Sequence, residues 1–277
     1  MIPTILILAG QRDGKPDALA KTQGLSHKAM IKVGGEALIG HVLRAIDAAL
    51  PESKIIVSIE NWPAIAGEPS VARLHKAGRL EHVRSHASLY GSIVSAAADK
   101  NFPMLITTAD NALLTPEAVL AMVDAGAKHD AAIVGVTRRE AIERAHSGGK
   151  GRYYEFADGA FSNCNLFWIS SRDSLYAAET FKEGGQFLKV KGRLLKTFGL
   201  ANLLLYRFKV MTIEQMFERV SRRLGCQVVP LVLSDGRLAI DVDDVRSLQM
   251  VEDIMAGTPQ SPEAVNEVRR RVTRTGG

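Results

Sequence analysis

The chain has 277 residues, of which 46% are hydrophobic and 23% are charged, and its formal net charge at pH 7 is +5. This length and hydrophobic content suffice for one large α/β domain, which we expect to span residues 1–277 with a helical insertion at about 173–225. The mildly basic charge suits an anionic substrate. Nucleic acid is not an expected partner, because the basic residues are dispersed and only 6% of residues are aromatic.

The sequence predicts neither a secretory leader nor a membrane span. The N-terminus enters an apolar strand without a preceding basic region, and no apolar run approaches the roughly 18–20 residues that cross a bilayer. Cys164 and Cys226 lie far apart and have neither a CxxC nor a metal-ligand spacing. They predict free thiols in a reducing compartment, so we expect a cytoplasmic protein.

Apolar runs alternate with helical patterns along the first half of the chain. Strands separated by helices imply right-handed crossovers, which predicts the α/β class: a three-layer α/β/α fold with a mostly parallel mixed sheet. From Arg138 the rhythm changes to a hairpin and then to the helical insertion. The expected strands are 2–8, 54–59, 81–84, 104–108, 131–136, a hairpin at 153–169, 228–233 and 238–242; the expected helices are 37–50, 69–76, 91–99, 115–128, 244–255 and a peripheral helix after 259.

The opening of the chain has the pattern of an anion-binding edge. An apolar run ends at Gly10 and gives way to a basic loop with Arg12 and Lys15, and a further lysine, Lys28, precedes the turn at 33–35. Open α/β sheets bind ligands at the carboxyl ends of their strands, where backbone N–H groups and cations can hold phosphates. For any single basic residue the alternative is a solvated surface charge. The expected triphosphate contacts are Arg12, Lys28 and the loop residues Leu8, Ala9, Gly10, Gln11 and Lys15.

Acidic residues follow two other predicted strands. Asp110 comes directly after the run at 104–108, where a carboxylate suits Mg²⁺; its alternative role is a turn or helix cap. In the predicted strand at 238–242, Asp241 and its neighbour two residues on, Asp243, would project to the same face and flank one cation. Asp244 is better placed to cap the following helix.

Two further polar sets are weaker candidates. Small residues around the start of the predicted helix at 91–99, namely Ser88, Gly91 and Ser92, could admit a base or a ribose, although an N-cap explains much of the same sequence. Asn163 and Asn165 could face the acceptor, with turn or edge packing as the alternative. The histidines have no HxH or HExxH spacing, and no GxSxG or GxxxxGK[ST] motif occurs, which argues against zinc, hydrolase and P-loop chemistry.

The sequence resembles the MobA-like NTP transferases, which have a GT-A-like α/β fold. The resemblance rests on Leu8-Ala9-Gly10 with Arg12, the segment 27–35, Thr108-Ala109-Asp110 and Asp241-Val242-Asp243, and it covers residues 1 to about 137 and about 228 to 256. It implies transfer of NMP from an NTP to a phosphorylated small-molecule acceptor with release of pyrophosphate. Arg12 and Lys28 would then hold the triphosphate, with Mg²⁺ on Asp110 and on Asp241 or Asp243.

Two rival hypotheses remain at this point. In a GT-A glycosyltransferase, Asp241-Val242-Asp243 would serve as the DxD motif, although that motif usually lies mid-chain and such an enzyme releases no pyrophosphate. In a non-catalytic nucleotide-binding or membrane-surface regulatory protein, the basic and apolar residues at about 189–207 would contact lipid. The simpler explanation of that segment is an amphipathic helix packed on its own domain.

Overall fold

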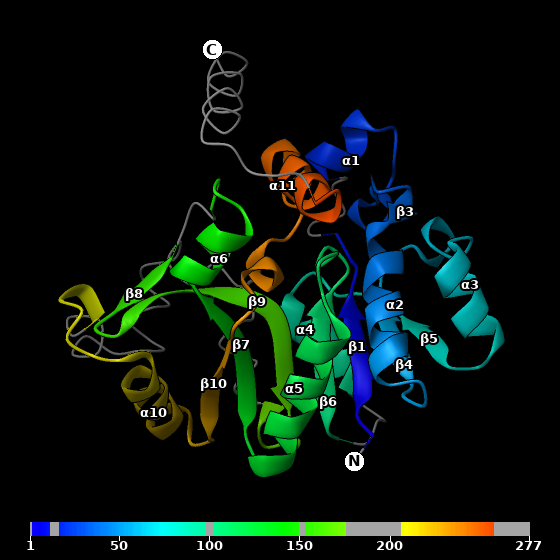
Figure 1. The fold of residues 1–277 in the computed structure, drawn as a ribbon. Coiled ribbons are helices and arrows are strands. Elements are labelled where there is room, and N and C mark those ends of the chain that lie inside the picture. The colour runs from blue at the N-terminus through cyan, green and yellow to red at the C-terminus, as the bar shows by residue number, and fades with distance from the viewer. Residues whose placement is uncertain (1, 12–16, 98–101, 150–152, 176–205, 258–277) are drawn as a thin grey trace.

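A mixed β-sheet forms the centre of the molecule (Figure 1). The computed structural model describes residues 2–11, 17–97, 102–149, 153–175 and 206–257. Within these ranges the main sheet has eight strands in the order β10-β7-β9-β6-β1-β4-β5, with β8 paired to β9. The strands are β1 (Thr4–Leu8), β4 (Ile55–Ser58), β5 (Leu80–Val83), β6 (Met104–Thr108), β7 (Ala132–Arg138), β8 (Tyr154–Phe156), β9 (Gly159–Ile169) and β10 (Val228–Leu233).

Most of the sheet is parallel, so most of its strands end at one edge. β1 pairs in parallel with β4 and β6, β4 with β5, and β7 with β10, whereas β9 runs antiparallel between β6 and β7. The loops that follow β1, β4, β5, β6, β7 and β10 therefore leave from the same edge, which is the upper edge in Figure 1. Ligands of open α/β sheets bind at this edge.

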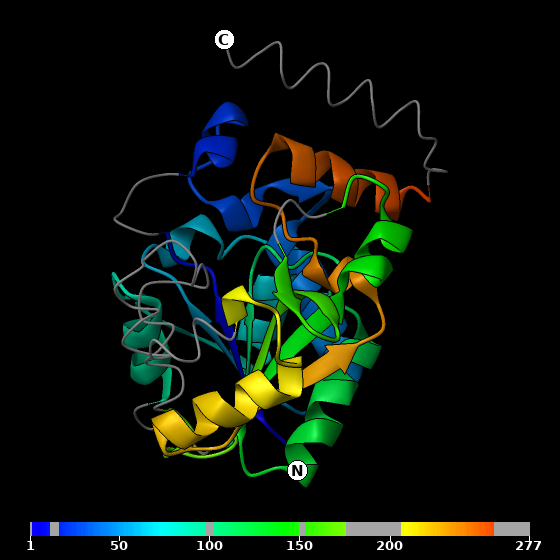
Figure 2. The same cartoon turned by 90° about the vertical axis from the view of Figure 1, so that its left-hand side faces the viewer.

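Helices cover both faces of the sheet, which confirms the expected three layers (Figures 1 and 2). Alternate residues of β1 separate the two cores: Ile5 and Ile7 pack with α2 (Leu38–Ala49), α3 (Pro69–Lys76) and α5 (Pro116–Lys128), while Leu6 packs with α4 (Leu89–Ala97) and α10 (Ile213–Leu224). A strand buried on both faces requires an unbroken apolar run, and this is why residues 5–8 are continuously apolar.

Local sequence explains where several elements begin. The side chain of Thr115 accepts a hydrogen bond from the backbone of Ala118, and Pro116 occupies the first turn of α5. Asp244 forms a capping box with Ser247 at the start of α11 (Val245–Met255), as its sequence position predicts. The predicted hairpin is also present, as β8 and the start of β9.

The predicted strand at 238–242 is wrong. Residues Gly236–Ala239 form a short 3-10 helix, η5, because the side chain of Asp235 accepts a hydrogen bond from the backbone of Arg237 and nucleates a turn. The sequence analysis also overlooked α1 (Ala18–Thr22), α6 (Arg139–Ala145), η2 (Lys28–Met30), η3 (Trp62–Ala64) and the small hairpin of β2 (Lys32–Val33) and β3 (Glu36–Ala37).

Part of the predicted helical insertion lies outside the described residues, and so do the stretch 189–205 and the tail after 259. The described part of the insertion includes α10, which is helical as expected. Among the described helices, none combines the length and the apolar character needed to span a bilayer. Both cysteines are free thiols, and Cys164 is buried.

An acid-sensitive ion pair fastens α2 to α3 and to the start of β5. Asp47 accepts a hydrogen bond from Arg73 Nη2 at 2.8 Å and another from Arg79. Burial alone would raise the pKa of Asp47, but the hydrogen bonds from Arg79 and Arg73 outweigh it and lower the pKa. A group whose pKa is depressed on folding stabilises the protein above its unfolded pKa of about 3.9, and this contribution is lost as the pH falls through the folded value.

We therefore expect Asp47→Asn to lower the free energy of unfolding by about 1 kcal/mol at pH 7, and the difference from wild type to shrink below about pH 4. Urea unfolding at several pH values measures both effects. Asp124→Asn on α5 is the control, because that side chain is exposed. A cost of Asp47→Asn that stayed constant down to pH 2 would contradict the assigned role of the ion pair.

Candidate functional site

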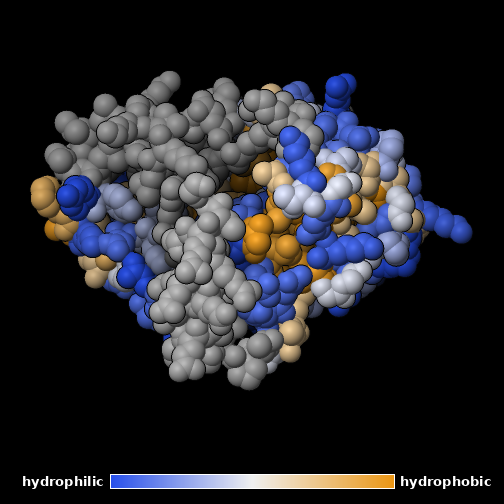
Figure 3. Space-filling view, turned by 90° about the horizontal axis from the view of Figure 1, so that it is seen from above, coloured by the Kyte–Doolittle hydropathy of each residue, from blue (hydrophilic) through white to orange (hydrophobic). Residues whose placement is uncertain are grey.

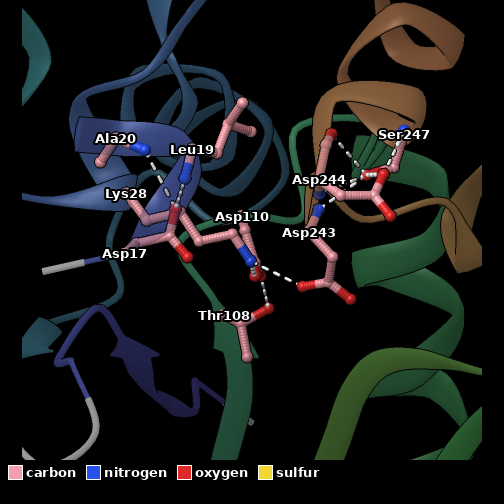
Figure 4. Close-up of polar contacts among 9 residues, drawn as sticks. All are labelled: Asp17, Leu19, Ala20, Lys28, Thr108, Asp110, Asp243, Asp244 and Ser247. Atoms are coloured by element: carbon pink, nitrogen blue, oxygen red, sulfur yellow. Dashed lines mark hydrogen bonds and ion pairs between the residues drawn. The ribbon is translucent and has the colours of Figure 1, made fainter. Parts of the chain in front are cut away.

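One lysine and two carboxylates from distant parts of the chain meet at the carboxyl edge of the sheet (Figure 4). Lys28 Nζ lies 2.5 Å from Asp110 Oδ2 and 2.7 Å from Asp243 Oδ1. Carboxylate oxygens of Asp110, Asp241 and Asp243 all lie within 4.8 Å of one another. Of the residues proposed from sequence, the structure thus brings together Lys28 and all three metal candidates.

Asp110 owes its position to the end of β6. The hydroxyl of Thr108, the last residue of the strand, donates to Asp110 Oδ1 at 2.5 Å and orients the carboxylate. The next residue, Asn111, is fully buried, and its Nδ2 donates to the backbone oxygen of Cys164 on β9 at 3.0 Å. The loop that carries Asp110 is therefore held by one hydrogen bond from the residue that ends β6 and by another to β9.

The late acids reach the site from η5 rather than from a strand. Ile240 and Val242 are buried, while Asp241 is half-buried and Asp243 is exposed, so the apolar and acidic residues still alternate. The backbone N–H of Val242 donates to the carbonyl of Asp110 at 3.3 Å and joins this segment to the loop after β6. Asp244 accepts from the backbone of Ser247 at the start of α11, apart from the acid cluster (Figure 4).

The electrostatics of Lys28 follow from these neighbours. Burial alone would lower the pKa of its ammonium group, but the carboxylates of Asp110 and Asp243 outweigh burial and raise the pKa above its ordinary value. Lys28 is thus a permanent cation at neutral pH. In the described structure it neutralises part of the negative charge that the acid cluster concentrates.

The loop after β1 lies next to the segment that carries Lys28. The side-chain amide of Gln11 donates to the backbone oxygen of Ser26 at 2.7 Å, and its carbonyl accepts from the backbone of Asp17, which caps α1. Arg12 and Lys15 fall outside the described residues. Figure 3 looks down on this edge of the molecule and shows hydrophobic residues lying between hydrophilic ones.

The two weaker sets lie at the start of helix α4 and on strand β9. Ser88 Oγ accepts from the backbone of Gly91, and Ser92 Oγ accepts from the backbone of His86, so both hydroxyls take part in the start of α4. Asn163 and Asn165 lie on β9, and their side chains hydrogen-bond to each other at 3.2 Å. Asn165 has a φ of +47° where the register between β7 and β9 shifts.

The sequence analysis did not single out Glu60, and it gave no role to the side chains of Thr108 and His27. Glu60 lies just after β4, at the same edge as Asp110, and its carboxylate accepts hydrogen bonds from Gln11, His27 and Ser85. The rule that selected Asp110, an acid directly after a buried strand, also selects Glu60. Thr108 is part of the quoted motif Thr108-Ala109-Asp110, but the sequence analysis gave its hydroxyl no role.

Comparison with known proteins points to one family. The sequence model of the MobA-like NTP transferase domain matches residues 5–197. No curated protein sequence matches the chain. A solved structure described as a hypothetical transferase from Thermus thermophilus is 23% identical, with a TM-score of 0.72 over 90% of this chain and 100% of that one.

Two further solved structures resemble the fold. A CMP:2-keto-3-deoxy-manno-octonic acid synthetase complexed with CTP is 14% identical, with a TM-score of 0.54 over 94% of this chain and 100% of that one. A 2-C-methyl-D-erythritol 4-phosphate cytidylyltransferase, also from Thermus thermophilus, is likewise 14% identical, with a TM-score of 0.50 over 92% and 98% of the two chains. At these identities the likeness concerns the fold.

Proposed function

Because the chain belongs to the MobA-like NTP transferase family, we propose that it transfers the NMP group of a nucleoside triphosphate to a phosphorylated small molecule and releases pyrophosphate. The observation that carries this proposal is the meeting of Lys28 with Asp110, Asp241 and Asp243 at the carboxyl edge of the sheet. Clustered carboxylates can hold a metal ion, and a neighbouring lysine can contact the phosphates, as the binding of a metal–triphosphate complex requires. We further propose that residues 1–277 act as one catalytic domain.

The acid cluster fits Mg²⁺. Three carboxylate oxygens within 4.8 Å of one another can contact a single ion, and oxygen is the donor that Mg²⁺ prefers. We assign Asp110, together with Asp241 or Asp243, as ligands. When bound, Mg²⁺ would neutralise charge on the phosphates and help to orient them.

The remaining roles concern residues of the chain itself. The triphosphate is bound by Lys28 and Arg12 and is contacted by the loop at 8–11 and by Lys15. The nucleoside lies against Ser88, Gly91 and Ser92. The acceptor lies against Asn163 and Asn165. An oxygen of the acceptor phosphate attacks the α-phosphorus, forming one P–O bond while the bond to the β-phosphate breaks. Pyrophosphate departs with that electron pair towards Arg12. No general base is required, since the attacking oxygen is already anionic near neutral pH.

Binding of the four common NTPs in the presence of Mg²⁺ is the first test. A ligand that binds only the folded protein raises its melting temperature, and we expect one NTP to do so more than the others. CTP is included because two structures of similar fold are described by cytidine-nucleotide chemistry. Absence of a shift with every NTP would contradict the proposal.

Pyrophosphate release is the second test, with phosphorylated sugars and alcohols as acceptors. We expect Asp110→Asn to reduce release by about 10³-fold or more, because it removes a charge that a metal-bound transition state requires. Asp124→Asn is the control. Transfer of a sugar without pyrophosphate would instead identify a glycosyltransferase, and normal turnover of Asp110→Asn would remove this residue from the mechanism.

A further inference from the structure

Glu60 joins three segments that are far apart in the sequence. It follows β4, and its Oε2 accepts hydrogen bonds from the backbone N–H of Gln11 at 3.1 Å and from the hydroxyl of Ser85 at 3.0 Å. Its Oε1 lies 3.1 Å from Nε2 of His27. These donors come from the loop after β1, from the loop after β5 and from the residue directly before Lys28.

The hydrogen-bond partners of His27 define how its ring is used. The side chain is buried, with 3% of the residue exposed. Burial alone would raise the pKa of Glu60, but hydrogen bonds from its own backbone N–H, from the backbone of Gln11 and from the hydroxyl of Ser85, together with the electrostatic effect of His27, outweigh burial and lower the pKa, so the carboxylate is ionised and can only accept. Nε2 of His27 therefore donates to Glu60, and Nδ1 forms a hydrogen bond with the hydroxyl of Ser26 at 2.9 Å.

The contact between Glu60 and the loop after β1 leaves no spare room. A Cβ atom on Gly10 would lie 2.6 Å from the Cβ of Ser85 and 3.1 Å from Glu60 Oε2. Glycine is thus required where the backbone approaches these side chains. Together with the bond from Gln11 to the carbonyl of Ser26, this arrangement fastens the two ends of the 11–27 segment to each other.

We propose that Glu60 is a positioning residue of the nucleotide site. It fixes the backbone at Gln11 directly and fixes the start of η2 through His27, so that the loop after β1 and Lys28 are held in place before substrate arrives. A site that is ordered in advance loses less free energy to ordering when its ligand binds. The proposal rests on the proposed function, because it assigns these two segments to nucleotide binding.

Hydrogen–deuterium exchange of the nucleotide-free protein tests the positioning itself. Glu60→Gln replaces one accepting carboxylate oxygen by an amide NH₂ group, which cannot accept a hydrogen bond from the donors that face it. We therefore expect the backbone amides of Gln11 and of residues 26–30 to exchange at least tenfold faster, with the exchange of α2 unchanged. His27→Phe fills the same space without donating; it should loosen 26–30 and leave Gln11 protected, and it serves as the second variant if Glu60→Gln does not fold. Glu68→Gln is the matched control, since Glu68 is a buried carboxylate that, like Glu60, accepts from a backbone N–H, that of Val71 at the start of α3.

Nucleotide binding provides the second measurement. With the NTP that most stabilises the wild type, Glu60→Gln should weaken binding at least tenfold and raise KM by more than it lowers kcat, whereas Glu68→Gln should change neither. Wild-type exchange at Gln11 and 26–30 in Glu60→Gln would overturn the proposal, as would equal loosening of these segments in Glu68→Gln. Exchange requires no nucleotide, so failure of the proposed function, seen as absence of NTP binding to wild type, is distinguishable from failure of this inference.

Discussion

Replacing Lys28 by methionine is expected to slow nucleotidyl transfer strongly and, in the same variant, to tighten the binding of a divalent cation to the nucleotide-free protein. The first effect follows from the loss of a cation that we propose binds the triphosphate, and a decrease of about 10²–10³-fold is typical for such a group. The second follows from the position of Nζ, which contacts both Asp110 and Asp243. In the described structure the ammonium group neutralises the carboxylates that we assign to the metal.

Methionine has a similar length and no charge, so Lys28→Met leaves the acid cluster without its counter-ion. The ammonium group no longer repels a divalent cation. We therefore expect the Kd for Mn²⁺, measured by titration calorimetry, to fall at least tenfold, which corresponds to about 1.4 kcal/mol of binding free energy. The melting temperature of the metal-free variant should drop, because neighbouring carboxylates repel one another, and Mn²⁺ should restore it.

Two further variants separate charge from side-chain volume. Lys28→Arg keeps the positive charge and should bind Mn²⁺ as weakly as wild type, and Lys32→Met removes an exposed lysine of β2 and should leave the Kd unchanged. If Lys28→Met bound Mn²⁺ no more tightly than wild type, the lysine and the metal would not compete for these carboxylates.

The position of an acid relative to a buried strand proved to be a reliable guide to its place in the fold. Asp110 follows an apolar run, and the parallel pairing of β6 with β1 brings it to the edge where Lys28 lies. The parallel order itself could be inferred from the alternation of strands and helices. The insertion of β9 between β6 and β7 could not, because strand pairing is decided by tertiary packing and not by the local sequence of the hairpin.

The late acids reached the predicted location although the element predicted for them is wrong. The argument for Asp241 and Asp243 assumed a strand, whereas the structure has η5 followed by an extended segment. The alternation survives because Ile240 and Val242 are buried in the core, so Asp241 and Asp243, which alternate with them, face the site. The place of Glu60 after β4 could have been selected by the same rule as that of Asp110. Its hydrogen-bond partners could not, because they lie 25 to 49 residues away in sequence and only the folded chain brings them together.

The closest backbone contact near the site predicts a large loss of stability. Gly236 begins η5 and packs on α6, where an added Cβ would lie 2.1 Å from the carbonyl carbon and oxygen of Ala141 and 2.3 Å from the nitrogen of Ile142. These are backbone atoms of a helix whose residues Ala141 and Ile142 are buried, so no side chain can rotate away. We expect Gly236→Ala to lower the free energy of unfolding by about 3 kcal/mol.

Because η5 leads directly to Asp241 and Asp243, the displacement required by Gly236→Ala should also disturb the acid cluster. Urea unfolding followed by circular dichroism measures the stability, and Mn²⁺ titration of the folded variant should show weaker binding than wild type. Gly67→Ala is the matched control: an added Cβ there meets no atom within 4 Å, so its effect should stay within about 0.5 kcal/mol. Equal stability of the two variants would mean that η5 and α6 can separate freely, and the late acids would then not be held by this packing.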